Sequence, residues 1–303
     1  MSIRQNWISV WITTLCVSPA ACSSGSTEPA PLEPSPPLPA EVILAGGNIA
    51  TCGSTNDEAT AALLDNLPGT IFVLGDNAFS DGSSEAYSTC YHPSWGRHKA
   101  RTYAALGNHE YISGNADPSF DYFGDRAGPR GLGYYSFDLG NWHIIVLNIN
   151  DAVSYEAGSA QDRWLEADLA ANQKTCTLAL WHSPRFFSSN TVGWTSNASI
   201  TAVWNRLYAA GVDVVLNGHQ HQYERFPPLT PTGARDDARG IRQFNAGTAG
   251  ESAEMPTAIA QQSEALSDAF GILELTLDDG NYSWEFIPSV AGQFSDTGSG
   301  TCH

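Results

Sequence analysis

Five apolar runs of strand length recur along the chain, and each is followed closely by Asn, Asp or His. The runs cover residues 42–45, 71–74, 103–106, 177–180 and 212–216. Short apolar runs with glycine at the boundary are typical of buried strands, because glycine lets the backbone turn sharply where a strand ends. The pattern therefore predicts five strands, each ending beside a polar side chain.

Three helices are predicted from apolar residues that recur with helical spacing, at residues 55–64, 159–171 and 197–210. Thr55 and Glu58 have the spacing of a capping box at the start of the first, and Gly211 follows the last as a stop signal. Two hairpins are expected around the turns Gly140-Asn141 and Asp279-Gly280. Together these elements predict an α/β fold with mixed sheets.

The polar residues at the strand ends predict one shared site. In open α/β sheets, ligands bind outside the carboxyl ends of the strands. The residues placed there are Asn48, Asp76, Asn108, His182, His219 and His221. Imidazoles and carboxylates in one pocket bind first-row metal ions, and a site for two ions needs a short anionic ligand that can bridge them. Asp76 is the natural bridge.

Each of these residues also has a structural interpretation when taken alone. Asp76 could be a turn residue, Asn108 a helix cap and His182 a hydrogen-bonded core histidine. Their joint placement at successive strand ends favours the metal site.

The charge of the chain excludes one class of partner. It carries 14 basic and 32 acidic residues, a formal net charge of −18 over 303 residues. Nucleic-acid binding through the phosphate backbone needs clustered Lys and Arg, so no nucleic-acid partner is expected. An anionic substrate would be repelled by so acidic a surface unless bound cations reverse the sign locally.

The N-terminal segment has the features of an export signal. An apolar stretch from Trp7 to Val17 follows Arg4 and precedes small residues ending at Cys22. We expect a signal peptide over 1–21, a Pro-rich tether over 22–40 and one folded domain over 41–303. Cys22 could carry a lipid anchor or simply follow a cleavage site. Either outcome predicts a secreted or surface-anchored, extracytoplasmic protein, of bacterial type.

The four remaining cysteines are expected to form two disulfides, as an even number in an exported chain usually does. Three pairings are possible. We favour Cys52 with Cys90 and Cys176 with Cys302, of which the second would hold the C-terminal tail. A zinc site is the competing interpretation, although no two of these cysteines have the close spacing of zinc-binding pairs.

The motifs resemble those of the calcineurin-like metallophosphoesterases, in particular the purple acid phosphatases and their bacterial relatives. The resembling segments, in the family's order, are Gly75-Asp76, Gly107-Asn108-His109-Glu110, His182-Ser183-Pro184 and Gly218-His219-Gln220-His221-Gln222-Tyr223-Glu224-Arg225. They span most of the chain between residues 41 and 245. The resemblance implies a four-layer sandwich, in which two mixed β-sheets are flanked by helices, and hydrolysis of small phosphate esters.

The resemblance also assigns roles. Asn108, His182 and His219 would hold one metal ion, His221 and the residue after the first strand would hold the other, and Asp76 would join both. The ions are expected to be divalent zinc, manganese or iron, and a metal-bound hydroxide would attack phosphorus in line. His109 would be the general acid for the leaving alkoxide. Tyr223, Glu224 and Arg225 would support the site from outside it.

The chain departs from this family at two positions. The family has Asp after the first strand, where this chain has Asn48, and purple acid phosphatases have Tyr where this chain has Phe79. A neutral amide is a weaker ligand than a carboxylate for a hard cation, so one of the two metal sites is expected to be weak. The alternative function is therefore a non-catalytic or weakly active surface protein that binds metal or phosphate.

Overall fold

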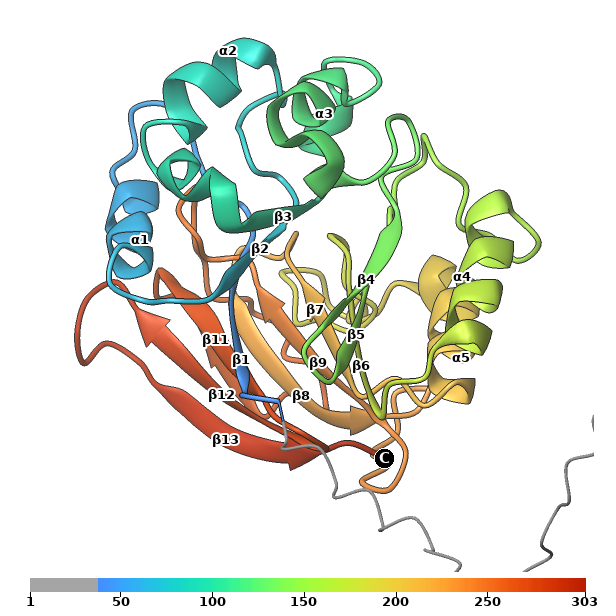
Figure 1. Cartoon of the computed structure of the whole chain (residues 1–303). Coiled ribbons are helices and arrows are strands. Elements are labelled where there is room, and N and C mark those ends of the chain that lie inside the picture. The colour runs from blue at the N-terminus through green and yellow to red at the C-terminus, as the bar shows by residue number, and fades with distance from the viewer. Residues whose placement is uncertain (1–37) are drawn as a thin grey trace, which may run out of the picture. The chain divides into compact units, whose positions relative to one another are not determined.

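The computed structural model describes residues 38–303. The expected signal peptide, Cys22 and all but the last three residues of the expected tether lie outside the described residues. Figure 1 shows two β-sheets with helices on either side. Among residues 38–303, none of the helices combines the length and the apolar composition that crossing a bilayer requires.

The strands form a six-stranded and a seven-stranded sheet. The first has the order β13-β12-β11-β1-β2-β3 and the second the order β10-β8-β9-β7-β6-β5-β4. The strands of the first sheet are β1 (Glu41–Gly46), β2 (Thr70–Leu74), β3 (Thr102–Ala105), β11 (Gly271–Leu277), β12 (Asn281–Pro288) and β13 (Asp296–Thr301). The strands of the second are β4 (Tyr135–Leu139), β5 (Trp142–Val146), β6 (Cys176–Leu180), β7 (Val214–Asn217), β8 (Tyr223–Leu229), β9 (Ile241–Ala246) and β10 (Ala265–Ser267). Both sheets are mixed, because β1–β3 and β5–β7 with β9 run parallel while the other pairings are antiparallel.

The helices are short and lie between strands. They are α1 (Asn56–Leu64), α2 (Ser84–Ala86), α3 (Asp117–Phe123), α4 (Ala160–Ala171) and α5 (Thr201–Ala209), with single-turn or irregular helices η1 (Tyr87–Tyr91), η2 (Trp95–Arg101), η3 (His109–Tyr111), η4 (Gly124–Ala127) and η5 (Ala198–Ile200). All three predicted helices and both predicted hairpins are present.

One detail of the helix prediction was wrong. The side chain of Thr55 makes no capping hydrogen bond at the start of α1. The hydroxyl of Ser54 instead accepts from the backbone N–H of Asn56, which satisfies one of the free N–H groups at the first turn. Ser159, by contrast, caps α4 as its sequence position suggests, accepting from the backbone N–H of Asp162.

Side chains of the central strands point alternately to the two faces of each sheet, and this alternation produces the four layers. In β2, Phe72 and Leu74 point into the core between the two sheets, while Ile71 and Val73 point toward α1 and α3. The strands of the second sheet alternate in the same way, with their outer residues packed against α4 and α5. The predicted sandwich of two mixed sheets flanked by helices is confirmed.

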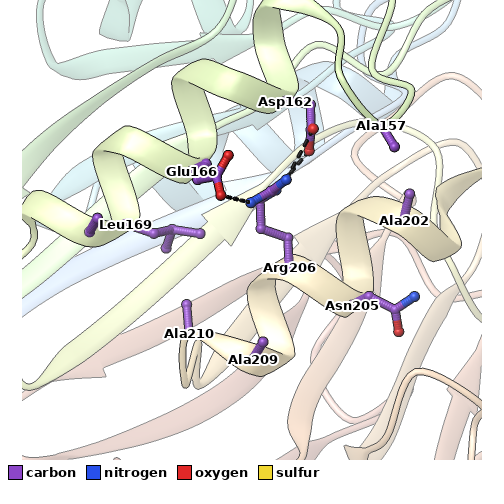
Figure 2. Close-up of a pocket in the computed structure, with 10 residues that line it drawn as sticks. Ala157, Asp162, Glu166, Leu169, Ala202, Asn205, Arg206, Ala209 and Ala210 are labelled. Carbon is purple, nitrogen blue, oxygen red and sulfur yellow. Dashed lines mark hydrogen bonds and ion pairs between the residues drawn. The ribbon is translucent and has the colours of Figure 1, made fainter.

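A partly buried ion pair joins the two outer helices of the second sheet. Arg206 of α5 donates to both carboxylate oxygens of Asp162 at 2.7 and 3.0 Å and approaches Glu166 at 3.2 Å (Figure 2). Both acidic residues lie on α4. These three residues, with five alanines, line part of a groove of about 580 Å³.

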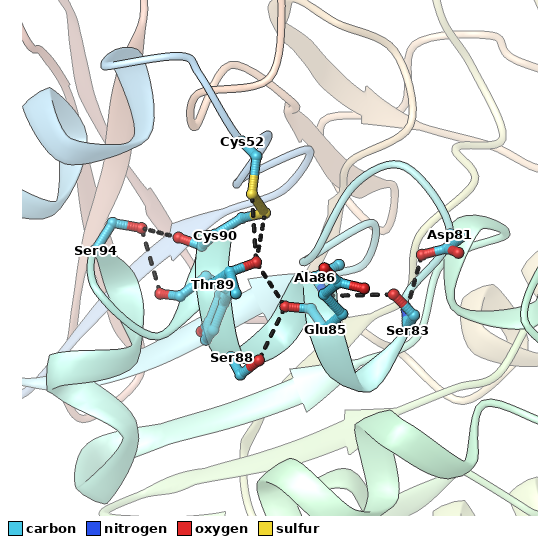
Figure 3. The surroundings of a disulfide bond; sticks show 10 residues. Cys52, Asp81, Ser83, Glu85, Ala86, Ser88, Thr89, Cys90 and Ser94 are labelled. Carbon is cyan, nitrogen blue, oxygen red and sulfur yellow. Dashed lines mark hydrogen bonds between the residues drawn. A yellow bond between two sulfur atoms is a disulfide. The ribbon is translucent and has the colours of Figure 1, made fainter.

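Both predicted disulfides are present, and the interpretation of these cysteines as a zinc site was therefore wrong. Cys52–Cys90 links the segment after β1 to η1, and the hydroxyl of Thr89 lies 3.5 Å from both sulfur atoms (Figure 3). Cys176–Cys302 joins β6 of the second sheet to the residue after β13 of the first. The second disulfide therefore connects the two sheets.

A buried carboxylate beside the second disulfide gives a pH-dependent contribution to stability. Asp213 is 2% exposed and accepts hydrogen bonds from the backbone N–H groups of Thr177 and His303. Burial raises the pKa of Asp213 to about 6, although these hydrogen bonds oppose the shift. The folded state therefore binds this proton more tightly than the unfolded state, whose Asp pKa is 3.8.

We predict that Asp213 makes the folded state less stable as the pH rises from about 4 to about 6, by roughly 3 kcal/mol in total. Urea unfolding at a series of pH values measures this change. Asp213→Asn should lose this part of the pH dependence, since it removes the titrating group. An unchanged slope between pH 4 and 6 in the variant would contradict the assignment.

Candidate metal centre

Asp76 follows β2 in a backbone conformation that its neighbours make possible. Its φ is +54°, in the left-handed region that non-glycine residues seldom adopt. Gly107, after β3, faces it so closely that a Cβ there would come within 2.1 Å of Asp76 Oδ1. Because glycine has no side chain, the loops after β2 and β3 can approach each other closely, with the Asp76 carboxylate between them.

Three of the predicted ligands meet at this point. Asp76 Oδ2 lies 3.0 Å from His182 Nε2, which in turn lies 3.2 Å from His219 Nδ1. The three ligand atoms all lie within 4.8 Å of one another. Asp76 comes from the first sheet and both histidines from the second, at the ends of β6 and β7.

The hydrogen bonds and charges around these residues leave their ligand atoms free for a cation. His182 Nδ1 donates to the carbonyl of Leu74 at 2.8 Å, so Nε2 is the nitrogen that faces Asp76. Burial alone would raise the pKa of Asp76, but His182 and the backbone N–H of His109 lower it to about 2. Burial and the adjacent His182 lower the pKa of His219 to about 4.

The donor set therefore fits a metal ion. Near neutral pH, Asp76 is anionic and His219 is neutral, which are the forms that bind metals. Burial would lower the pKa of His182, but the charge of Asp76 raises it, so a bound cation would displace that proton. One carboxylate oxygen and two imidazole nitrogens are a usual donor set for zinc, manganese or iron.

His109 and Asn108 lie on the loop after β3, next to this cluster. The backbone N–H of His109 donates to Asp76 Oδ1 at 2.9 Å, and its ring atom Nε2 lies 3.9 Å from Asp76 Oδ2. His109 Nδ1 lies 2.6 Å from the carbonyl oxygen of Ser80, to which it must donate. Asn108 is exposed, and it lies next to these contacts because it directly precedes His109 in the chain. The ring of Phe79 packs at a tilt of 46° against that of His109, with centroids 4.4 Å apart.

Asn48 lies at the site but uses its side chain to hold another residue. It is fully buried, and its Oδ1 accepts from the backbone N–H of His219 at 2.9 Å, while its Nδ2 faces the His219 carbonyl at 3.4 Å. Both residues have left-handed backbones, with φ of +57° and +65°. The carboxamide therefore fixes the loop that presents His219.

His221 is not among the three clustered ligands, and its Nδ1 contacts residues of the loop after β9. Its Nδ1 lies 2.9 Å from Glu251 Oε2 and 2.5 Å from the hydroxyl of Ser252. Its ring meets Phe79 edge-on, with centroids 6.2 Å apart. The sequence did not lead us to Glu251 and Ser252, although they follow β9 after Gly247-Thr248-Ala249-Gly250 and so repeat the strand-end signal of the other site residues.

Glu110 is a second residue whose role sequence reasoning missed. Its carboxylate is fully buried and accepts from three backbone N–H groups, those of Asp76, Asn77 and Gly107, at 2.7 to 2.9 Å. Burial and the nearby charge of Asp76 raise the pKa of Glu110. It joins the loops after β2 and β3 and holds Asp76 in its left-handed conformation.

Tyr223, Glu224 and Arg225 were expected to support the metal ligands, and the structure shows which residues they bind. Tyr223 and Arg225 both bond to Asp296 in β13, which ties the second sheet to the first. Glu224 binds the N–H and hydroxyl of Ser188, on the segment that follows His182. Their partners thus lie in the frame around the site, and none of these bonds reaches Asp76, His182 or His219.

Comparison with protein families places most of these residues in one domain. The sequence model for calcineurin-like phosphoesterases matches residues 52–223. Among curated proteins, purple acid phosphatase 15 of Arabidopsis thaliana is 28% identical over 214 residues, which cover 59% of this chain and 40% of the relative. The chain thus spans less than half the length of that relative.

Solved structures share the fold. Purple acid phosphatase PPD1 from yellow lupin seeds superposes with a TM-score of 0.66 at 20% identity, covering 88% of this chain and 55% of the lupin chain. GAP50, the anchor in the inner membrane complex of Plasmodium, superposes with a TM-score of 0.68 at 13% identity, covering 88% of this chain and 90% of its own. A phosphatase and an anchor protein therefore share this fold.

Proposed function

Because the chain belongs to the calcineurin-like phosphoesterase family, we propose that it hydrolyses small phosphate esters at a centre for two metal ions. The observation that carries the proposal is the convergence of Asp76, His182 and His219, from both sheets, with His109 beside them. Asp76 is the proposed bridging ligand of both metal ions. Asn108, His182 and His219 would hold one ion. Asn48 and His221 would hold the other.

The metal ions, when bound, supply Lewis acidity toward the phosphoryl oxygens and activate water for attack on phosphorus. The chain supplies the rest. Asp76 contributes the negative charge that both positions share, and Glu110 holds its backbone. Zinc, manganese and iron(II) all suit these donors, whereas Phe79 offers no phenolate oxygen of the kind that purple acid phosphatases use.

His109 is the proposed general acid. Because Nδ1 donates to the Ser80 carbonyl, Nε2 is the nitrogen that faces the centre. In the imidazolium form, Nε2 carries a proton that it can donate to the oxygen of a leaving alkoxide. The Phe79 ring against His109 restricts the orientation of the imidazole.

We predict that His109→Ala keeps its metal and loses rate, roughly 10²- to 10⁴-fold on alkyl phosphates. Esters with good leaving groups, such as p-nitrophenyl phosphate, should lose much less, because their leaving oxygen needs no proton. Steady-state kinetics on a series of leaving groups measures the difference. Equal losses across the series would remove His109 from the acid role.

The alternative is a metal- or phosphate-binding surface protein without turnover. Asn48 favours it, because a neutral carboxamide stands where the family has a carboxylate and its oxygen is bonded to the His219 backbone. GAP50, which has a similar fold, is described as an anchor. The fold alone therefore does not distinguish a catalytic protein from an attachment protein.

Metal content per chain, measured together with hydrolysis of p-nitrophenyl phosphate, distinguishes the two functions. The enzyme proposal expects one tightly held ion after dialysis and hydrolysis that rises as zinc or manganese is added. A chain that takes up two ions and remains inactive on a broad panel of phosphate esters would contradict it and favour the binding protein.

We also propose an extracytoplasmic location. Two disulfides support it, since disulfides persist in oxidising compartments. The proposal includes the signal peptide, followed by either a lipid anchor at Cys22 or simple cleavage, and mass spectrometry of the mature protein distinguishes these two outcomes. An acidic protein of this composition is still expected to have no nucleic-acid partner.

A further inference from the structure

The corner of the site around Asn48 contains a carboxylate from a distant part of the sequence. The backbone N–H of Glu251 donates to the carbonyl of Asn48 at 2.9 Å, so the two residues are neighbours in space. The side chain of Glu251 then reaches His221, with Oε2 2.9 Å from Nδ1. The hydroxyl of Ser252 contacts the same nitrogen at 2.5 Å and bonds to the same carboxylate oxygen.

These contacts are those of a histidine prepared for metal binding. Metal-binding histidines commonly donate their second ring N–H to a carboxylate, which fixes the tautomer and the direction of the ring. With the proton on Nδ1 directed to Glu251, the lone pair of His221 lies on Nε2. The Glu251 and His221 side chains are 24% and 27% exposed, so solvent weakens this contact only in part.

Resting on the proposed function, we infer that Glu251 supplies the negative charge that the position shared by Asn48 and His221 otherwise lacks. Asn48 contributes only a dipole there, and its oxygen is bonded to the His219 backbone. Glu251 acts through His221, which makes it a positioning residue for the second metal ion. In the family, an Asp after the first strand supplies this negative charge. In this chain, Glu251 on the loop after β9 would supply it.

Glu254 provides a matched control on the same loop. Its backbone N–H donates to the carbonyl of His221 at 2.9 Å, yet its carboxylate bonds to the side chain of Asn190 at 3.0 Å. Glu254→Gln therefore removes one negative charge close to His221 without removing a bond to the imidazole.

The test measures binding of zinc or manganese ions alone to the full chain, by equilibrium dialysis with elemental analysis. Wild type is expected to bind one ion tightly and one more weakly. Glu251→Gln should keep the tight ion and weaken the other 10- to 100-fold, as loss of such partners usually does. Glu254→Gln should stay within about threefold of wild type.

A rescue separates supply of charge from a structural effect. Adding Asn48→Asp to Glu251→Gln places a carboxylate at the family's position and retains an acceptor for the His219 N–H. We expect it to restore the affinity for the weaker ion at least tenfold. The inference would be overturned if this rescue failed, or if Glu251→Gln and Glu254→Gln had the same affinity for the weaker ion. It would also be overturned if Glu251→Gln lost the tight ion before the weaker one.

Hydrolysis is measured separately, on p-nitrophenyl phosphate. A chain that binds two ions, loses the weaker one in Glu251→Gln and never hydrolyses the ester would contradict the proposed function and support the role of Glu251. A chain that hydrolyses the ester and binds both ions unchanged in Glu251→Gln would support the proposed function and overturn the role of Glu251.

Discussion

Asp76→Asn is expected to abolish hydrolysis, with a loss of at least about a thousandfold, and to remove the ion that the wild type retains after dialysis. The substitution keeps the size of the side chain and the acceptor for the His109 N–H, but it removes the negative charge that lies 3.0 Å from His182. Kinetics on p-nitrophenyl phosphate and elemental analysis of the dialysed protein measure both effects.

Asp81→Asn is the matched control, since it removes a carboxylate from the same loop. Asp81 accepts from the backbone N–H of Ser83 and makes no contact with the three clustered ligands. Its variant should bind metal normally and stay within about twofold of the wild-type rate. Retention of the tightly held ion by Asp76→Asn would show that Asp76 is not the shared ligand.

Glu110→Gln is expected to lower the free energy of unfolding of the metal-free protein by roughly 2–4 kcal/mol. Glu110 accepts three buried N–H groups, and Gln offers one oxygen in place of two. Its amide group must then face at least one backbone N–H, leaving buried donors without an acceptor. Urea unfolding, followed by circular dichroism, measures the loss.

The exposed Glu85 serves as the control for this substitution. Glu85→Gln should change the free energy of unfolding by less than about 0.5 kcal/mol, as surface substitutions usually do. A Glu110→Gln protein as stable as Glu85→Gln would mean that the loops after β2 and β3 are held mainly by other contacts.

The central part of the fold was predictable because its strands are buried on both faces and therefore appear as continuous apolar runs. The same runs located Asp76, His182 and His219 at the ends of three strands, and the structure brings these ends together. The spacing could not reveal that the Asn48 side chain would bind the His219 backbone. Nor could it reveal that the His221 ring would face a carboxylate 30 residues further along the chain.

Strand β13 was not predicted, and its sequence shows the physical reason. Its sequence, Asp-Thr-Gly-Ser-Gly-Thr, has no apolar run. A Cβ at Gly298 would come within 2.3 Å of the Trp284 ring, and one at Gly300 within 2.4 Å of the Tyr282 ring. Glycine is needed at both positions because the aromatic rings of β12 fill the space, so a composition typical of a loop here forms an edge strand.

The Cys176–Cys302 link and the candidate centre occupy opposite ends of β6, since Cys176 begins that strand and His182 follows it. The disulfide braces the two sheets at one end, and a metal ion shared by Asp76 and His182 would brace them at the other. An ion present at a hundred times its dissociation constant would add about 2.7 kcal/mol to this second brace. A chelator should therefore loosen the sandwich at one end only, while reduction and chelation together would leave the sheets joined by packing and by hydrogen bonds such as those of Tyr223 and Arg225 to Asp296.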